Sequence, residues 1–326
     1  MFAFVLSRIL QAIPVLLAVG FIAFAMFAFV GDPVTIMLGT TYTEAEKVAL
    51  IQRLGLDQPF FVQYARFMLN ALRGEFGISY RLARPVMDLI VERLPATLEL
   101  AFAAATLALA IGVPMGVYTG IYRNAAASRF FLVFSLIGVS LPTFLIGILL
   151  ILAFSVSLGV LPSFGRGEVV RLGYWTTGFL TWGGLKALVL PAVTLGLFQM
   201  TLIMRLVRAE MMEVLRSDYV KFARARGLGN RAINFGHALR NTLVPVITIA
   251  GLQIGGIIAF SIVTETVFQW PGMGLLFVQS VQVADIPVMA AYLMLISVLF
   301  VGINLIVDLL YYAVDPRLRV SRAGAR

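Results

Sequence analysis

The sequence predicts an all-α integral membrane protein with six transmembrane helices, a short cytosolic helix in one loop and an extracytoplasmic cap between the first two spans. Three observations predict it: 60% of the 326 residues are hydrophobic, only 13% are charged, and long apolar runs recur along the chain. Soluble domains carry about 25% charged residues, so lipid is the expected solvent here. Each run must be helical, because hydrocarbon offers no partner to a bare backbone amide.

The apolar runs set approximate limits for the spans, which need about 20 residues each. The first run follows Arg8 and is longer than the roughly 7–15 apolar residues of a secretory signal. We therefore expect residues 1–31 to form an uncleaved N-terminal transmembrane helix. The six expected spans are 9–31, 97–122, 130–158, 188–206, 243–265 and 288–313.

Several proline and glycine residues lie within or at the ends of these spans. Pro95 is expected in the first turn of the second span, where a missing N–H costs nothing, and Pro191 at the start of the fourth. Pro142 in the third span and Gly112–Gly116 in the second predict kinks and close helix contacts. Ordinary packing variety explains them most simply, and hinges in a protein that opens and closes are the alternative.

Residues 32–96 are expected to form an ordered extracytoplasmic cap, followed by a five-span core over 97–326. Thr43 and Glu46 have the spacing of a capping box at the start of one amphipathic helix. Gly55–Pro59 reads as a turn, and Phe60 to Leu72 as a second helix.

The distribution of basic residues predicts that both termini lie in the cytoplasm. The short outer loops 159–187 and 266–287 hold 3 and 0 Lys and Arg residues, whereas the cytosolic pieces together hold 15. The cap holds 7, but long loops obey the rule poorly. The cytosolic pieces are 1–8, 123–129, 205–242 and 314–326.

The composition excludes several classes of chemistry. There is no cysteine and a single histidine, His237, so thiol catalysis and His-rich metal sites are impossible. No phosphate-binding Gly-Lys-Ser/Thr loop is present, so we expect no ATP site, no cofactor, no metal and no catalytic residue. The net charge of +9 comes from residues that flank apolar runs, which argues against nucleic-acid binding. For His237 a structural role is the simpler expectation and pH sensing the alternative.

Two carboxylates inside expected spans, Glu99 and Glu265, are candidates for a translocation pathway, because intramembrane charges are costly. Both lie toward the outer side and could line a vestibule. The simpler explanation for Glu99 is a carboxylate near the positive end of a helix dipole.

The loop at about 206–242 carries the most informative pattern. Ser217 is a suitable N-cap and Asp218 suits the first turn of a helix, which Gly227 can end with a left-handed residue. The spacing predicts that four residues share one face of that helix, and a second helical piece starts at Asn230. A basic helix lying on anionic lipid is the alternative to a helix that docks a soluble partner. The four residues are Tyr219, Phe222, Ala223 and Arg226.

Segments along nearly the whole chain resemble the integral-membrane permeases of bacterial ATP-binding-cassette importers of the dipeptide, oligopeptide and nickel type. The segments that carry the resemblance are Arg93–Leu100, Asp218–Leu228, His237–Pro245, Glu265–Phe268, Pro271–Gly274, Asn304–Asp308 and Asp315–Arg319. The family's loop bears a Glu-Ala-Ala signature followed by glycine. Aligned on Gly227, this chain has Lys221-Phe222-Ala223, so only Ala223 and Gly227 match.

The resemblance implies a permease subunit in the bacterial inner membrane that imports peptides or a similar small solute. It implies as partners a second homologous permease, two ATPase subunits and a periplasmic solute-binding protein, besides membrane lipid. The loop helix would be the coupling helix that docks an ATPase, through Ser217–Tyr219, Phe222, Ala223, Arg226 and Gly227. A stand-alone secondary carrier or channel is the alternative, and a polytopic membrane enzyme is a third possibility.

Overall fold

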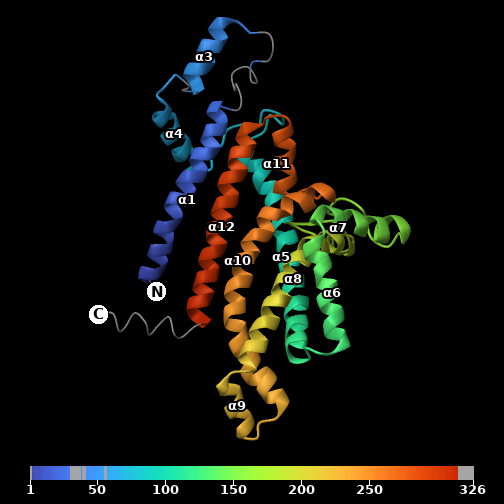
Figure 1. Cartoon of the computed structure of the whole chain (residues 1–326). Coiled ribbons are helices and arrows are strands. Elements are labelled where there is room, and N and C mark those ends of the chain that lie inside the picture. Colours follow the sequence, from blue (N-terminus) through green and yellow to red (C-terminus); the bar gives the residue numbers. More distant parts are fainter. Residues whose placement is uncertain (1, 30–37, 39–41, 55–56, 315–326) are drawn as a thin grey trace. The chain divides into compact units, whose positions relative to one another are not determined.

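The computed structural model describes residues 2–29, 38, 42–54 and 57–314, and nearly all of its elements are helices (Figure 1). The α-helices are α1 Phe2–Phe29, α3 Glu44–Leu54, α4 Phe60–Leu72, α5 Val86–Ile121, α6 Ala126–Ser140, α7 Thr143–Leu150, α8 Trp182–Val214, α9 Asp218–Ala225, α10 Leu239–Val267, α11 Met273–Gln282 and α12 Ile286–Val314. Two π-helical segments are η1 Ile151–Ser157 and η2 Ala232–Ala238. The expectation of an all-α fold misses one small hairpin, which joins β1 Val170–Leu172 to β2 Trp175–Thr177.

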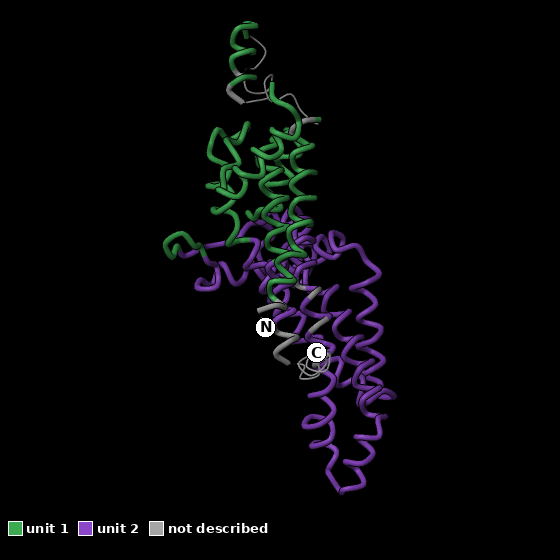
Figure 2. Tube along the Cα trace, turned by 90° about the vertical axis from the view of Figure 1, so that its left-hand side faces the viewer, with its two compact units in different colours: residues 1–96, 171–176, 271–301 green, residues 97–170, 177–270, 302–326 purple. Residues whose placement is uncertain are grey.

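The chain forms two compact units, coloured separately in Figure 2. Unit 1 comprises Met1–Ala96, Arg171–Thr176 and Pro271–Val301. Unit 2 comprises Thr97–Val170, Thr177–Trp270 and Gly302–Arg326. Each unit therefore draws on segments that are far apart in the sequence.

The described part of the chain contains four helices long and apolar enough to cross a membrane: Val5–Met26 within α1, α5, α8 and Ile286–Leu309 within α12. Two bent helix pairs raise the number to six if each pair is one span. One pair is Pro245–Gly251 with Gly255–Val267, which bends by 41°. The other is Ala126–Ser140 with Thr143–Ser157.

The expected third span is not one straight helix, because its two halves meet at an angle of 110°. The break falls at Leu141 and Pro142, which have extended ψ angles of 138° and 139°. A residue before proline is pushed out of the helical region by the proline ring. The kink expected from Pro142 is thus a sharp turn of the chain.

Two helices begin earlier than their apolar runs, so the positions expected for Pro95 and Pro191 are wrong. α5 starts at Val86 and α8 at Trp182, which places both prolines inside helices. Thr181 caps α8 by accepting a hydrogen bond from the Gly184 N–H at 3.0 Å. A hydropathy pattern marks only the part of a helix that faces lipid. Amphipathic turns and a capping residue can extend the helix past the end of its apolar run.

Unit 2 is built around α8, which packs against α5, α6, α7 and α10. The glycines of α5 allow the closest approach: a Cβ added at Gly112 would lie 2.9 Å from the Met200 carbonyl oxygen, and one at Gly116 2.7 Å from that of Met204. Gly120 continues the same stripe one turn later. Small residues at this spacing let two helix backbones approach closely, as the sequence predicted.

Unit 1 contains the two cap helices that the sequence predicted. The Thr43 N–H donates to Glu46 Oε2 at 2.8 Å and the Glu46 N–H donates to Thr43 Oγ1 at 3.3 Å, which completes the capping box of α3. The bonds that the Glu46 carboxylate accepts from the Thr43 N–H and, at 2.9 Å, from the Thr43 hydroxyl lower the pKa of Glu46. α4 lies against α1, where the Tyr64 hydroxyl donates to the Leu17 carbonyl at 2.8 Å. Of the expected turn at Gly55–Pro59, residues 55–56 lie outside the described residues.

Candidate functional site

The loop between α8 and α10 contains the short helix that the sequence predicted, α9, and its end is well defined. Gly227 has φ +79°. Its N–H donates to the Arg224 carbonyl at 2.9 Å, and the Leu228 N–H reaches back to the Ala223 carbonyl at 3.3 Å. This pair of bonds is a Schellman motif, which glycine closes without steric cost.

The start of α9 differs in one detail from the expectation. Ser217 occupies the N-cap position, but its side chain makes no capping bond. Its Oγ instead donates to the Val214 carbonyl at 2.7 Å and ties the helix to the end of α8. Asp218 lies in the first turn, where a carboxylate is favoured, and accepts a bond from Lys221 Nζ at 2.8 Å.

One face of α9 is buried inside the loop itself. Val220 and Ala223 are 0% and 5% exposed and pack with Ile233, which follows the turn. The second helical piece starts at Asn230, as expected, and continues through η2 into α10. Ala223 therefore does not share the exposed face with Tyr219, Phe222 and Arg226, because its small side chain fills the contact with η2.

The other face of α9 is open. Phe222 is 65% exposed and Tyr219 is 45% exposed. The Arg226 guanidinium lies 5.9 Å from the centre of the Phe222 ring. The Tyr219 hydroxyl is 2.8 Å from Nδ1 of His237, so the single histidine supports this face through a side-chain contact. The result is an ordered aromatic and basic surface on a loop with its own small core.

Glu99 lies in a closed polar cluster of unit 2, at 3% exposure. It pairs with Arg166, whose Nε donates at 3.0 Å, and it also accepts from the Thr177 hydroxyl and from the Gly178 N–H at 2.9 Å. Because α5 begins at Val86, Glu99 is not near the positive end of a helix dipole. Sequence reasoning missed Arg166. The only signal that could have found it is a basic residue in a short connection between two expected spans.

Glu265 is fully buried near the end of α10. Thr97 Oγ1 donates to its carboxylate at 2.7 Å, and Ser261 Oγ lies 3.2 Å away. A buried carboxylate is tolerated only when hydrogen bonds replace its lost water. Neither Glu99 nor Glu265 is open to solvent in this subunit.

Asp285 in unit 1 is a third buried carboxylate, which the sequence analysis overlooked. It accepts bonds from the Ser79 hydroxyl, the Tyr80 N–H at 3.1 Å and the Arg81 N–H at 3.3 Å. Burial and the Asp285 charge raise the pKa of Tyr80 to about 12. Among the described residues, no group of three or more His, Asp or Glu side chains could hold a metal ion.

Comparison with known proteins places the chain in a family. Residues 112–320 match the family described as the inner membrane component of binding-protein-dependent transport systems, and residues 1–101 match the N-terminal region of such components. The dipeptide transport system permease DppB of Alkalihalophilus pseudofirmus is 36% identical over 98% of this chain and 100% of its own. The oligopeptide transport system permease AppB of Bacillus subtilis is 39% identical over 98% of this chain and 99% of its own.

A solved structure shares the fold. An inward-facing structure of the MetNI methionine ABC transporter aligns with a TM-score of 0.56 at 21% identity, over 70% of this chain and 96% of that one. At 21% identity, this likeness shows a shared fold and nothing about function. On the family matches and the full-length relatives, the chain belongs to the inner-membrane permease components of binding-protein-dependent ABC importers.

Proposed function

We propose that this permease is one half of the translocation pathway of an ATP-driven importer, and that α9 is its coupling helix. The observation that carries the proposal is the exposed face of Tyr219, Phe222 and Arg226 on a helix fixed at both ends. A rigid helix transmits the motion of a docked ATPase better than a flexible loop, because domain switching proceeds by rigid-body movement. The family membership supports an importer over a stand-alone carrier or channel.

The proposed assembly contains a second homologous permease, two ATPase subunits and a solute-binding protein on the outer face. In the bacterial inner membrane the chain would cross six times, with the two bent helix pairs as the third and fifth spans and both termini in the cytoplasm. ATP would be hydrolysed only by the partner subunits. Because two relatives are named for dipeptide and oligopeptide transport, we propose short peptides as the solute.

Phe222→Ala tests the docking face. The side chain is largely exposed, so its removal should leave the subunit folded and weaken capture of the ATPases and peptide uptake together. Phe235→Ala is the matched control, because Phe235 is 55% exposed in the same loop but belongs to η2. Equal ATPase capture by wild type and Phe222→Ala would refute the coupling role. Ala223→Glu is a poorer test, because it would disrupt the core of the loop.

Single-cysteine labelling tests the orientation cleanly, since the chain has no native cysteine. Leu180, 65% exposed just before α8, should react with a membrane-impermeant thiol reagent in intact cells after Leu180→Cys. Ala232→Cys, in the loop after α8, should react only after lysis. Labelling of Ala232→Cys in intact cells would reverse the proposed topology.

A pathway role for Glu99 and Glu265 stays a prediction of the sequence. Both are buried and hydrogen-bonded in the single subunit, which supports a structural role instead. Glu265→Gln separates the two roles: a pathway residue would lower uptake in a normally assembled importer, whereas a structural one would lower the yield of the assembled complex.

A further inference from the structure

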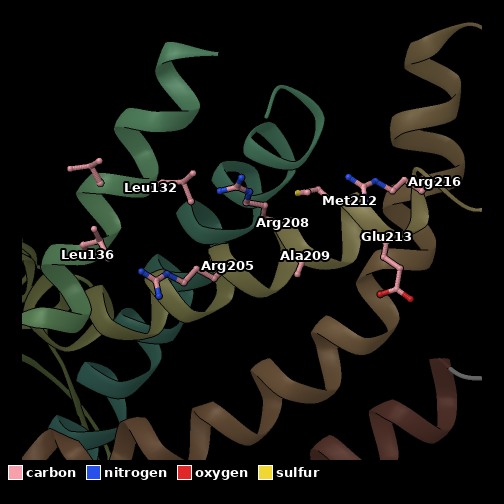
Figure 3. Close-up of a pocket in the computed structure, with 9 residues that line it drawn as sticks. Leu132, Leu136, Arg205, Arg208, Ala209, Met212, Glu213 and Arg216 are labelled. Atoms are coloured by element: carbon pink, nitrogen blue, oxygen red, sulfur yellow. The ribbon is translucent and has the colours of Figure 1, made fainter. Parts of the chain in front are cut away.

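An open groove lies in unit 2 between α6 and the end of α8, with a volume of about 820 Å³. Its apolar wall comes from Leu132, Val133 and Leu136 of α6. The facing wall carries three arginines, Arg205, Arg208 and Arg216. Figure 3 shows Arg205 and Arg208 extending from α8 beside the α6 side chains, whereas the Glu213 carboxylate turns to the other side of the ribbon.

Within the described part of the chain, none of the three guanidinium groups forms an ion pair. Glu213 is the one acidic side chain among the described residues that line the groove. Like charges gathered beside an apolar wall raise the local potential and attract an anion.

The depth of the arginines points to the surface of the membrane. Residues 187–204 of α8 carry no charge. At 1.5 Å per residue they rise about 27 Å, close to the hydrocarbon thickness of a bilayer. Arg205 and Arg208 are the first charged residues beyond this stretch. In a bilayer that covers the uncharged stretch, they would lie at the level of the lipid head groups, and the leucines and valine of α6 would lie beside the start of the acyl chains.

We propose that this groove binds an anionic phospholipid, with its phosphate between Arg205 and Arg208 and its acyl chains along α6. Basic pockets between transmembrane helices recognise acidic head groups in this way. Arginine suits the role because its planar donor fork matches phosphate geometry. The site does not involve the exposed face of α9, so it can exist whether or not that helix docks an ATPase.

The experiment measures lipid adducts on the purified importer complex by native mass spectrometry, after exchange into detergent with dioleoylphosphatidylglycerol or dioleoylphosphatidylcholine. Wild type should retain the phosphatidylglycerol and release the phosphatidylcholine. At about 1 kcal/mol per basic residue, Arg205→Gln with Arg208→Gln should weaken retention about thirtyfold. The matched control, Arg231→Gln with Arg240→Gln, removes the same charge from exposed arginines outside the groove and should retain the lipid.

Three outcomes would overturn the proposal. Equal retention by both double variants would show that net charge alone attracts the lipid. Displacement by glycerol 3-phosphate or by a dipeptide would assign the groove to a small anion or to the transported solute. Failure of a thiol reagent to label Val133→Cys in the delipidated complex would show that another subunit covers the groove. Loss of ATPase capture in Phe222→Ala leaves all of these readouts unaffected.

Discussion

At the scale of single residues, the buried charges are paired by partners that the sequence does not reveal. Glu99 meets Arg166 across 67 positions, and Asp285 meets Ser79 across 206. An unpaired charge in a low-dielectric interior costs several kcal/mol, so each carboxylate needs such a partner. Glu99 was identified as unusual from its place in an apolar run, but the fold decided whether it was paired.

Replacing either Glu99 or Arg166 alone should destabilise the folded subunit. Glu99→Gln and Arg166→Gln should each destabilise the subunit by about 3–5 kcal/mol, because each leaves one component of a buried pair uncompensated. The double variant should cost clearly less than the sum of the two. Thermal unfolding of the four proteins in detergent measures the coupling. Strict additivity would show that the two groups do not interact.

Tyr80 should titrate late. Burial and the Asp285 charge raise the pKa of its phenol to about 12 in the folded chain, whereas a tyrosine in an unfolded chain has a pKa of about 10. The neutral phenol of Tyr80 therefore contributes fully to the free energy of unfolding below about pH 10, and this contribution is lost as the pH rises toward 12. The tyrosinate absorbance of wild type minus that of Tyr80→Phe isolates this group. A difference curve centred near pH 10 would contradict the expectation.

At the level of helices and turns, two short-range signals are confirmed and one is not, since Ser217 occupies the N-cap position of α9 without a side-chain capping bond. The capping box of Thr43 and Glu46 forms at the expected helix start, and Gly227 has the positive φ expected at the end of α9. The break after α6 was underestimated, since Pro142 turns the chain by 110°. A proline predicts disruption of a helix, but the direction the chain then takes depends on what it packs against.

Gly227 and Gly229 offer a matched pair for testing the end of α9. Neither has a neighbouring atom within 4 Å of an added Cβ, but only Gly227 has positive φ. Gly227→Ala should cost about 1–2 kcal/mol of local stability through backbone strain, and Gly229→Ala should cost little. The hydrogen-exchange rates of the α9 backbone amides measure the free energy of local unfolding of this helix. Equal exchange in both variants would mean that the turn relaxes without strain.

At the scale of the whole molecule, each unit brings together distant segments, and close helix contacts set the spacing in unit 2. Gly112, Gly116 and Gly120 recur every four residues and form one stripe of α5. The stripe meets the backbone and side chains of α8. Van der Waals packing of small residues replaces the hydrophobic drive that is missing between helices in lipid.

Gly116→Ala should destabilise unit 2, because its Cβ would lie 2.6 Å from Val207 Cβ and 2.7 Å from the Met204 carbonyl oxygen. Overpacking of this kind costs about 1–3 kcal/mol. Gly302→Ala in α12 is the control, since nothing lies within 4 Å of its added Cβ and alanine favours the helix. Thermal unfolding in detergent compares them. Equal melting temperatures of the two variants would show that the close contact of the glycine stripe with α8 does not contribute to stability.

The amino-acid sequence predicts a helical membrane protein and the helices α3, α4 and α9, because hydropathy, capping and turn chemistry act between near neighbours. Its motif segments carry the resemblance to the permease family. The exact helix starts were hidden, since α5 and α8 extend past their apolar runs. The fold was needed to show that Ala223 faces inward, that Arg166 neutralises Glu99 and that Arg205 and Arg208 line an open groove. Those facts depend on contacts between distant segments, which no periodicity along the chain encodes.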